Sequence, residues 1–109
     1  MPYNEKLVAR VRSVLKGKRN VGERKMFGGL TFMLRGNMVC GVENDRLMVR
    51  VGPDAHDDAL SRPHARPMDF TGRPMKGFVY VEPAGLKRDA DLKTRVQRGV
   101  DFAMSLPAK

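Results

Sequence analysis

The chain has 109 residues, a formal net charge of +9 and an isoelectric point near 10.3. This is the length of a single domain, and an apolar fraction of 41% with a charged fraction of 30% is ordinary globular usage, which excludes disordered, collagen-like and low-complexity chains. No stretch approaches the ~18 uninterrupted apolar residues of a membrane span, and the N-terminus lacks the apolar core of a signal peptide. We therefore expect a cytoplasmic protein with no membrane partner.

An amphipathic helix is predicted over residues 5–16. Asn4 can accept a hydrogen bond from the first free amides of this helix. Apolar residues then recur at helical spacing on one face, at Leu7, Val8, Val11, Val14 and Leu15. Gly17 follows, and a glycine there can end the helix in a left-handed conformation at no steric cost.

Four strand-like segments follow, separated by turn-forming residues. They cover residues 21–27, 30–34, 38–43 and 46–51. This spacing predicts an antiparallel meander. In the last segment Leu47 and its alternate neighbours point to the core face, while Arg46, Met48 and Arg50 point to a second face that we expect to be exposed.

The second half of the chain predicts two further helices. Pro53 suits the first turn of a short helix that reaches Ser61, and a loop over residues 62–77 follows, with a brief edge strand at 68–70. The β-branched and aromatic run over residues 78–81 predicts the last strand. Beyond it a long amphipathic helix is marked by Leu92, Val96, Val100 and Ala103 and ended by Pro107.

This order of elements predicts one α+β domain over residues 1–109. We expect two layers, an antiparallel sheet of about five strands with the helices on one face. The other face of the sheet is then a candidate interface.

Four separated motifs point to a family. They are Lys25-Met26-Phe27-Gly28-Gly29-Leu30, Gly36-Asn37-Met38, Arg50-Val51-Gly52-Pro53 and the run from Arg66 to Gly77. Present in this order, they resemble the N-terminal domain of the TfoX/Sxy family. The resemblance covers nearly the whole chain, up to the Ser105-Leu106-Pro107 ending.

The resemblance implies a two-layer fold similar to the type III secretion chaperones, often dimeric. It also implies a part in transcription regulation, because the family takes its name from regulators of natural competence, that is, of DNA transformation. The chain resembles the first half of those regulators, and we expect a stand-alone domain without their second, helical domain. The motifs name no catalytic residues.

The residues themselves predict no enzyme, metal site or cofactor. Ser61, His64 and an aspartate at 57 or 58 are the residue types of a nucleophilic triad, but no positioning signature accompanies them. His56 and His64 lack the spacings of zinc sites. Cys40 is the only cysteine, and its alternating apolar neighbours predict a buried thiol.

The positive charge is concentrated near the N-terminus, where residues 1–25 hold eight Lys or Arg and two acids. The cluster that we single out is Lys16, Lys18, Arg19, Arg24 and Lys25. Contacts between such side chains and phosphates are favoured by counterion release. Because no helix-turn-helix signature or aromatic interleaving is present, we expect at most weak, non-sequence-specific binding of nucleic acid.

The leading hypothesis is a non-enzymatic regulatory or adaptor domain that acts by protein association, as a homodimer through its sheet and with an unidentified protein partner. The alternative is a weak nucleic-acid-binding module that uses the N-terminal cluster. The candidate contact residues of the leading hypothesis are Arg46, Met48, Arg50, Arg66, Met68, Phe70, Arg73, Met75 and Lys76.

Overall fold

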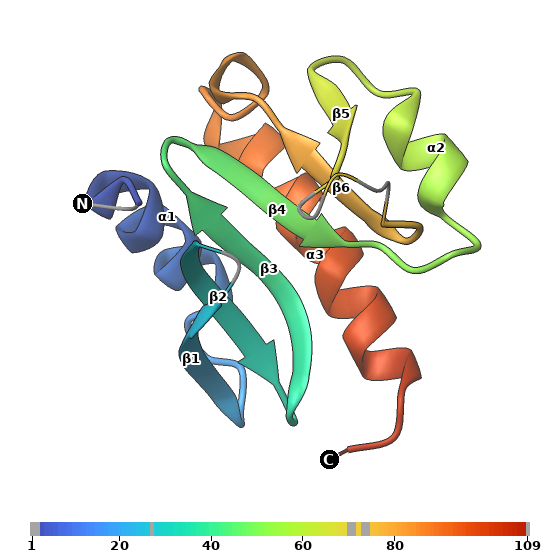
Figure 1. The fold of residues 1–109 in the computed structure, drawn as a ribbon. Helices are drawn as coiled ribbons and strands as arrows, with labels where there is room; N and C mark the ends of the chain where they lie inside the picture. The colour runs from blue at the N-terminus through green and yellow to red at the C-terminus, as the bar shows by residue number, and fades with distance from the viewer. Residues whose placement is uncertain (1–2, 27, 70–71, 73–74, 109) are drawn as a thin grey trace.

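The fold was analysed in a computed structural model that describes residues 3–26, 28–69, 72 and 75–108 (Figure 1). Its long helices, its short helix and its strands follow one another in the order that the sequence predicts. They are α1 (Glu5–Leu15), β1 (Val21–Met26), β2 (Gly29–Leu34), β3 (Asn37–Glu43), β4 (Arg46–Arg50), α2 (His56–Leu60), β5 (Ala65–Pro67), β6 (Phe78–Val81), the short 3-10 helix η1 (Pro83–Gly85) and α3 (Asp89–Ser105). The α+β class is confirmed.

All strands join one antiparallel sheet in the order β1-β2-β3-β4-β6-β5. The described sheet therefore has six strands, where about five were expected. The additional strand is β5, which lies at the edge and pairs with β6 from Ala65 opposite Val81 to Pro67 opposite Val79. Pro67 is tolerated there because an edge strand does not need every backbone donor.

Two predicted boundaries are wrong, and both corrections lie between β4 and β6. The short helix begins at His56 and not at Pro53. The backbone N–H groups of Val51 and Gly52 both donate to the carbonyl of Gly77, at 2.8 and 3.0 Å, and this contact holds the chain just before Pro53, so the helix starts only after a turn. The edge strand expected at 68–70 lies earlier, at β5. Met68 and Asp69 are outside any strand, and Phe70 falls outside the described residues.

The first helix forms as predicted. The side chain of Asn4 accepts a hydrogen bond from the backbone N–H of Leu7 at 3.1 Å, which caps the N-terminus of α1. Gly17 adopts a φ of 90° after the helix, a left-handed conformation that glycine reaches without strain. The buried residues of α1 are Leu7, Val8, Val11 and Leu15.

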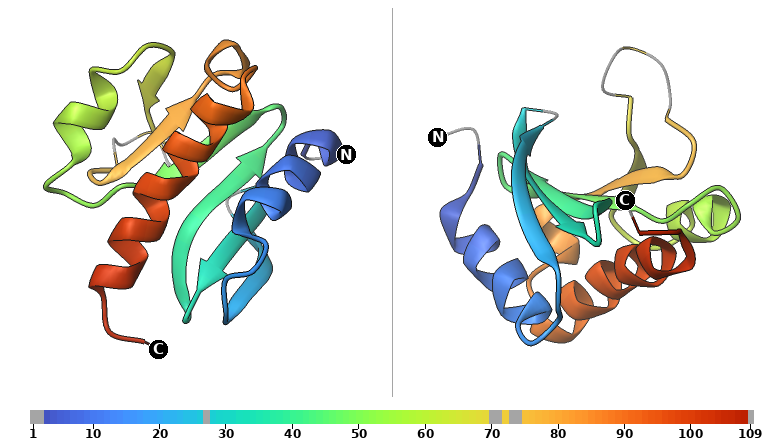
Figure 2. Two further views of the ribbon diagram at one scale, coloured as in Figure 1. Left: turned by 180° about the vertical axis from the view of Figure 1, so that it is seen from behind. Right: turned by 90° about the horizontal axis from the view of Figure 1, so that it is seen from below.

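Both long helices cover one face of the sheet (Figure 2). Their apolar sides join the aliphatic side chains of β2, β3, β4 and β6 in the main core. Helix α3 approaches β3 so closely at Gly99 that a Cβ atom there would lie 2.2 Å from the carbonyl oxygen of Val39. Val39 is the extra residue of a bulge, since Phe32 pairs with Cys40 and Met33 with Met38.

Candidate interaction surface

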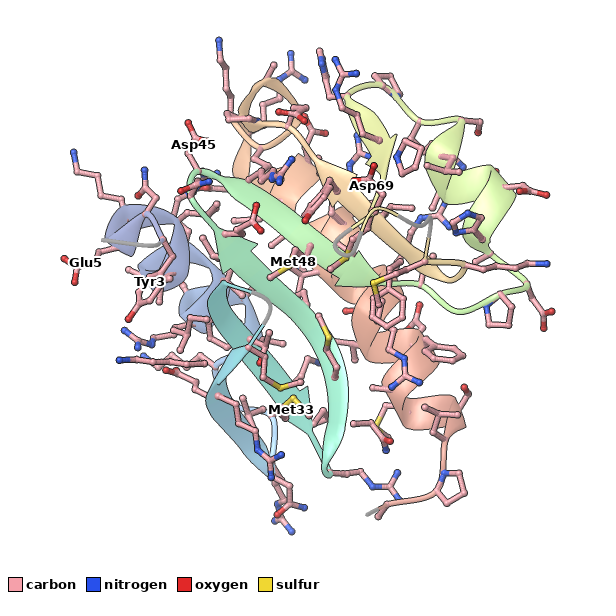
Figure 3. All side chains as sticks on the ribbon, viewed as in Figure 1. Tyr3, Glu5, Met33, Asp45, Met48 and Asp69 are labelled. Carbon is pink, nitrogen blue, oxygen red and sulfur yellow. The ribbon has the colours of Figure 1, made fainter. Side chains whose placement is uncertain are left out.

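The opposite face of the sheet has no helical layer among the described elements, and it is the face turned to the viewer in Figures 1 and 3. We call it the helix-free face. One row of directly paired residues crosses it through all six strands. From β1 to β5 this row is Arg24, Thr31, Gly41, Met48, Tyr80 and Arg66. An arginine thus stands at each end of the face, and the middle of the row is buried.

A second apolar cluster lies on this face, separate from the main core. It consists of Met38, Met48, Met68 and Tyr80, with Met33, Met75 and Phe78 packed against it. Met48 and Met68 are fully buried, so their expected exposure is wrong. The physical reason is that the chain returns over the sheet, where the N–H of Met75 donates to the carbonyl of Met68 at 2.7 Å. We call the region of β4, β6 and β5 the methionine end.

Arg46 is engaged within the methionine end. Its guanidinium lies 3.6 Å from the centroid of the Tyr80 ring, and its Nε donates to the Glu43 carboxylate at 2.8 Å. Burial raises the pKa of Tyr80, and the negative charge of Glu43 raises it further. Arg46 is half-buried, and its guanidinium contacts both the Tyr80 ring and the Glu43 carboxylate.

The other predicted contact residues lie around this cluster. Arg50 is half-buried, with its guanidinium 5.1 Å from the ring centroid of Phe102. Arg66 is exposed and pairs with Glu82 at 3.3 Å. Met75 is half-buried and Lys76 is exposed. Phe70 and Arg73 lie outside the described residues.

The five N-terminal basic residues gather at the other end of the sheet. Lys16, Lys18 and Arg19 are exposed in the connection between α1 and β1, and Arg24 and Lys25 are exposed on β1. Within the part of the chain that the structure describes, none of these five forms an ion pair. The structure therefore places this cluster along β1 and the loop that leads into it.

Arg35 lies beside this cluster, although its position in the sequence does not indicate it. The hydrogen bond from its backbone N–H to the carbonyl of Asn20, at 3.0 Å, holds the β2–β3 turn against the start of β1. The pairing of Val21 with Leu34 places Arg35 one residue beyond. The predicted hairpin of the first two strands was the sequence signal that could have placed Arg35 next to the start of β1. We call Lys16, Lys18, Arg19, Arg24, Lys25 and Arg35 the basic end.

The acid of β1 is already paired. Glu23 accepts two hydrogen bonds of 2.8 Å from the guanidinium of Arg12 on α1. These bonds hold the pKa of Glu23 below its ordinary value. The carboxylate of Glu23 is therefore committed to the helix-covered side of β1 and does not neutralise Arg24 on the other side.

The polar stretch around α2 does not assemble a triad. The hydroxyl of Ser61 donates to the backbone carbonyl of Asp58 at 2.6 Å. The Asp58 carboxylate is bound by Arg98 and Arg62, which lower its pKa. The Nδ1 atom of His56 accepts the backbone N–H of Gly77 at 2.9 Å. Each of these groups has a structural partner.

The comparisons with known proteins agree with this geometry. A family model described as the TfoX N-terminal domain matches residues 13–103. The chain belongs to the TfoX N-terminal domain family. The match spans the six described strands, most of α3 and only the last residues of α1, so both ends of the sheet are parts of this domain. No curated protein and no solved structure matches the chain.

In this TfoX N-terminal domain Cys40 lies in the main core, as predicted, and burial raises the pKa of its thiol far above the ordinary value. Within the described residues, no three His, Cys, Asp or Glu side chains come together in a way that would hold a metal ion. Over the same residues, every helix is too short or too polar to cross a bilayer.

Proposed function

We propose that this TfoX N-terminal domain is a non-enzymatic regulatory or adaptor domain that acts by protein association, and that it forms a homodimer through the methionine end. The observation that carries the proposal is the helix-free face, which leaves half-buried Met75 and Phe78 beside exposed Lys76. Methionine, aromatic and arginine side chains are enriched in interfaces. The resemblance to competence regulators supports a part in transcription regulation.

The charges of the methionine end suit contact with a second copy. Arg46 pairs with Glu43, Arg66 pairs with Glu82, and Asp69 is exposed nearby, which leaves the region nearly balanced. In a two-fold dimer the same patch meets itself, so a patch with both signs of charge can be self-complementary. A patch of one sign would repel its copy.

Light scattering coupled to size-exclusion chromatography tests this proposal. We expect a dimer, and we expect Lys76→Glu to weaken it, because this change reverses a charge beside Met75. Lys93→Glu on α3 is the matched control and leaves the dimer intact, since Lys93 is exposed on the far side of the molecule. A monomer at all protein concentrations sinks the dimer proposal.

The second candidate function is weak, non-sequence-specific binding of nucleic acid at the basic end. It is supported by the six basic side chains of this region, none of which has an ion pair within the described chain. Fluorescence anisotropy with labelled mixed-sequence DNA and RNA tests it at low and near-physiological salt. Binding that survives near-physiological salt supports this function, and binding only at low salt leaves the basic end to solvation or to another partner.

A further inference from the structure

Strand β1 lies at one edge of the sheet and pairs on its other side with no described strand. Two hydrogen bonds show which of its backbone groups face β2. The carbonyl of Arg24 accepts the Thr31 hydroxyl at 2.9 Å, and the carbonyl of Asn20 accepts the N–H of Arg35 at 3.0 Å. Both carbonyls therefore point toward β2. Because backbone groups alternate in direction along a strand, the odd-numbered residues of β1 direct their N–H and C=O groups away from β2. These residues are Val21, Glu23 and Lys25.

Some of the registers in which this edge could pair with a second copy of itself are disfavoured by charge. In an antiparallel pair related by a two-fold axis, one residue lies directly opposite its own copy. A register centred on Glu23 or Lys25 would therefore oppose two identical charges, with no compensating pair of opposite charges beside them on the strand. Like charges in directly opposed positions destabilise a strand pair. A strand of opposite charge would meet no such penalty.

The surroundings of the edge are positive on both sides. Lys25 and the loop residues Lys16 and Lys18 are exposed near it, and Arg24 faces the helix-free side. The negative charge of Glu23 is taken up by Arg12. An incoming segment with carboxylates would therefore find unneutralised partners next to a row of free backbone groups.

A groove of about 610 Å³ lies beside β1 on the helix-free side. Arg24 and Arg35 supply its positive charge, and Met33 supplies an apolar wall. A strand added to β1 would direct every second side chain to this side, at a spacing of roughly 7 Å. The groove could then receive carboxylates and aliphatic groups from the same segment.

We propose that the free edge of β1 binds an extended acidic segment of a partner protein, which adds a seventh strand to the sheet. Main-chain hydrogen bonds to the outward groups supply affinity, and the basic end selects acidic sequences. This inference rests on the proposed adaptor role and names the class of its partner. A nucleic acid would also meet the positive charges, but its phosphates would not complete a strand ladder.

Labelled peptides test the inference by fluorescence anisotropy at near-physiological salt. A ten-residue peptide that alternates Glu with Val should bind, and a peptide of equal charge with Pro in place of Val should bind about tenfold or more weakly, because Pro lacks the N–H and disfavours pairing. Equal affinity for the two peptides, or no saturable binding up to about 1 mM, would overturn the proposal. Tighter binding of a ten-nucleotide oligothymidylate than of the Glu–Val peptide would overturn it in favour of nucleic acid.

Two variants at one position separate backbone from charge. Lys25→Gln removes the charge and keeps the outward N–H, whereas Lys25→Pro removes both without breaking a bond to β2. We expect Lys25→Pro to bind the Glu–Val peptide about threefold to tenfold more weakly than Lys25→Gln, which is the effect of one hydrogen bond. Equal affinities would contradict strand addition. Circular dichroism verifies that both variants fold.

A second comparison does not depend on proline. Arg24→Gln and Arg35→Gln should each weaken the Glu–Val peptide severalfold, and Lys93→Gln on α3 should leave its affinity unchanged. An equal loss in all three would contradict a local site. Failure of peptide binding alone leaves the homodimer standing, because the dimer is measured without peptide and by changes at the methionine end.

Discussion

The methionine end and the basic end lie at opposite ends of one sheet, and they differ in how their charged side chains are paired. At the methionine end Arg46 pairs with Glu43 and lies over Tyr80, and the chain returns to bury Met48. At the basic end Arg24 and its basic neighbours have no ion pair within the described chain. The chain thus pairs its own charged groups where it covers itself, and it leaves them exposed to solvent without ion pairs at the basic end.

The largest effect expected from this difference is on stability. Met48→Ala should lower the free energy of unfolding by about 2–5 kcal/mol, because the side chain is fully buried in the second apolar cluster. Met33→Ala is the matched change nearer the basic end, and it should cost less than about 1 kcal/mol because Met33 is half-exposed. Urea unfolding measures both, and equal losses would show that the two ends are packed alike.

A smaller effect on stability is expected for one arginine at each end of the sheet, Arg46 at the methionine end and Arg24 at the basic end. Arg46→Ala should cost about 1–2 kcal/mol, since it removes the contact with Tyr80 and leaves the mostly buried Glu43 carboxylate without its cationic partner. Arg24→Ala should change stability by no more than about 0.5 kcal/mol, because its side chain is exposed and has no ion pair within the described chain. Thermal unfolding followed by circular dichroism compares the two variants, and a similar cost for both would remove the distinction.

Much of this arrangement follows from sequence patterns, and the exceptions have a common cause. Leu7 to Leu15 repeat at helical spacing, and Leu47 alternates with Arg46 and Met48, so the helix and the strand were predictable. The burial of Met48 was not, because it depends on Met68 and Met75, more than fifteen residues further along the chain. Alternation tells which residues share a face but not which later segment covers it.

The candidate sites divide in the same way. Lys16 to Lys25 form a sequence-local cluster, so their proximity was predictable from the helix and the strand that follow one another. Arg35 was not predicted, because it comes close to Asn20 only through the pairing of β1 with β2. The register of a hairpin, when its turn is evident, is the signal that can recover such residues.

The basic end can be changed without a change in stability. The triple variant Lys16→Glu, Lys18→Glu and Arg19→Glu should unfold within about 0.5 kcal/mol of the unmodified protein, because all three side chains are exposed. Its binding of mixed-sequence DNA at low salt, measured by anisotropy, should fall about tenfold or more. Retained DNA binding would place the contact elsewhere, and a large loss of stability would show that these residues support the fold.

The smallest expected effect is a pH dependence at the Arg12–Glu23 pair. Arg12 lowers the pKa of Glu23 in the folded protein, so the pair contributes stability above the unfolded pKa of about 4.3, and that contribution is lost as the pH falls through the folded pKa. Glu23→Gln should therefore lower the melting temperature slightly near pH 6, and the difference should shrink as the pH is lowered through the acid range. A constant difference across this range would show that the carboxylate charge is not its source.

The docking of α3 through Gly99 against the bulge at Val39 has a consequence for synthesis on the ribosome. Helix α3 follows every strand in the chain, so the aliphatic face of the β1–β4 meander emerges before the helix that covers most of it. Domains generally fold as units during translation, and exposed apolar sheet surface favours aggregation of incomplete chains. Completion of this domain therefore waits for its last helix, and chains interrupted before Gly99 would need protection by chaperones.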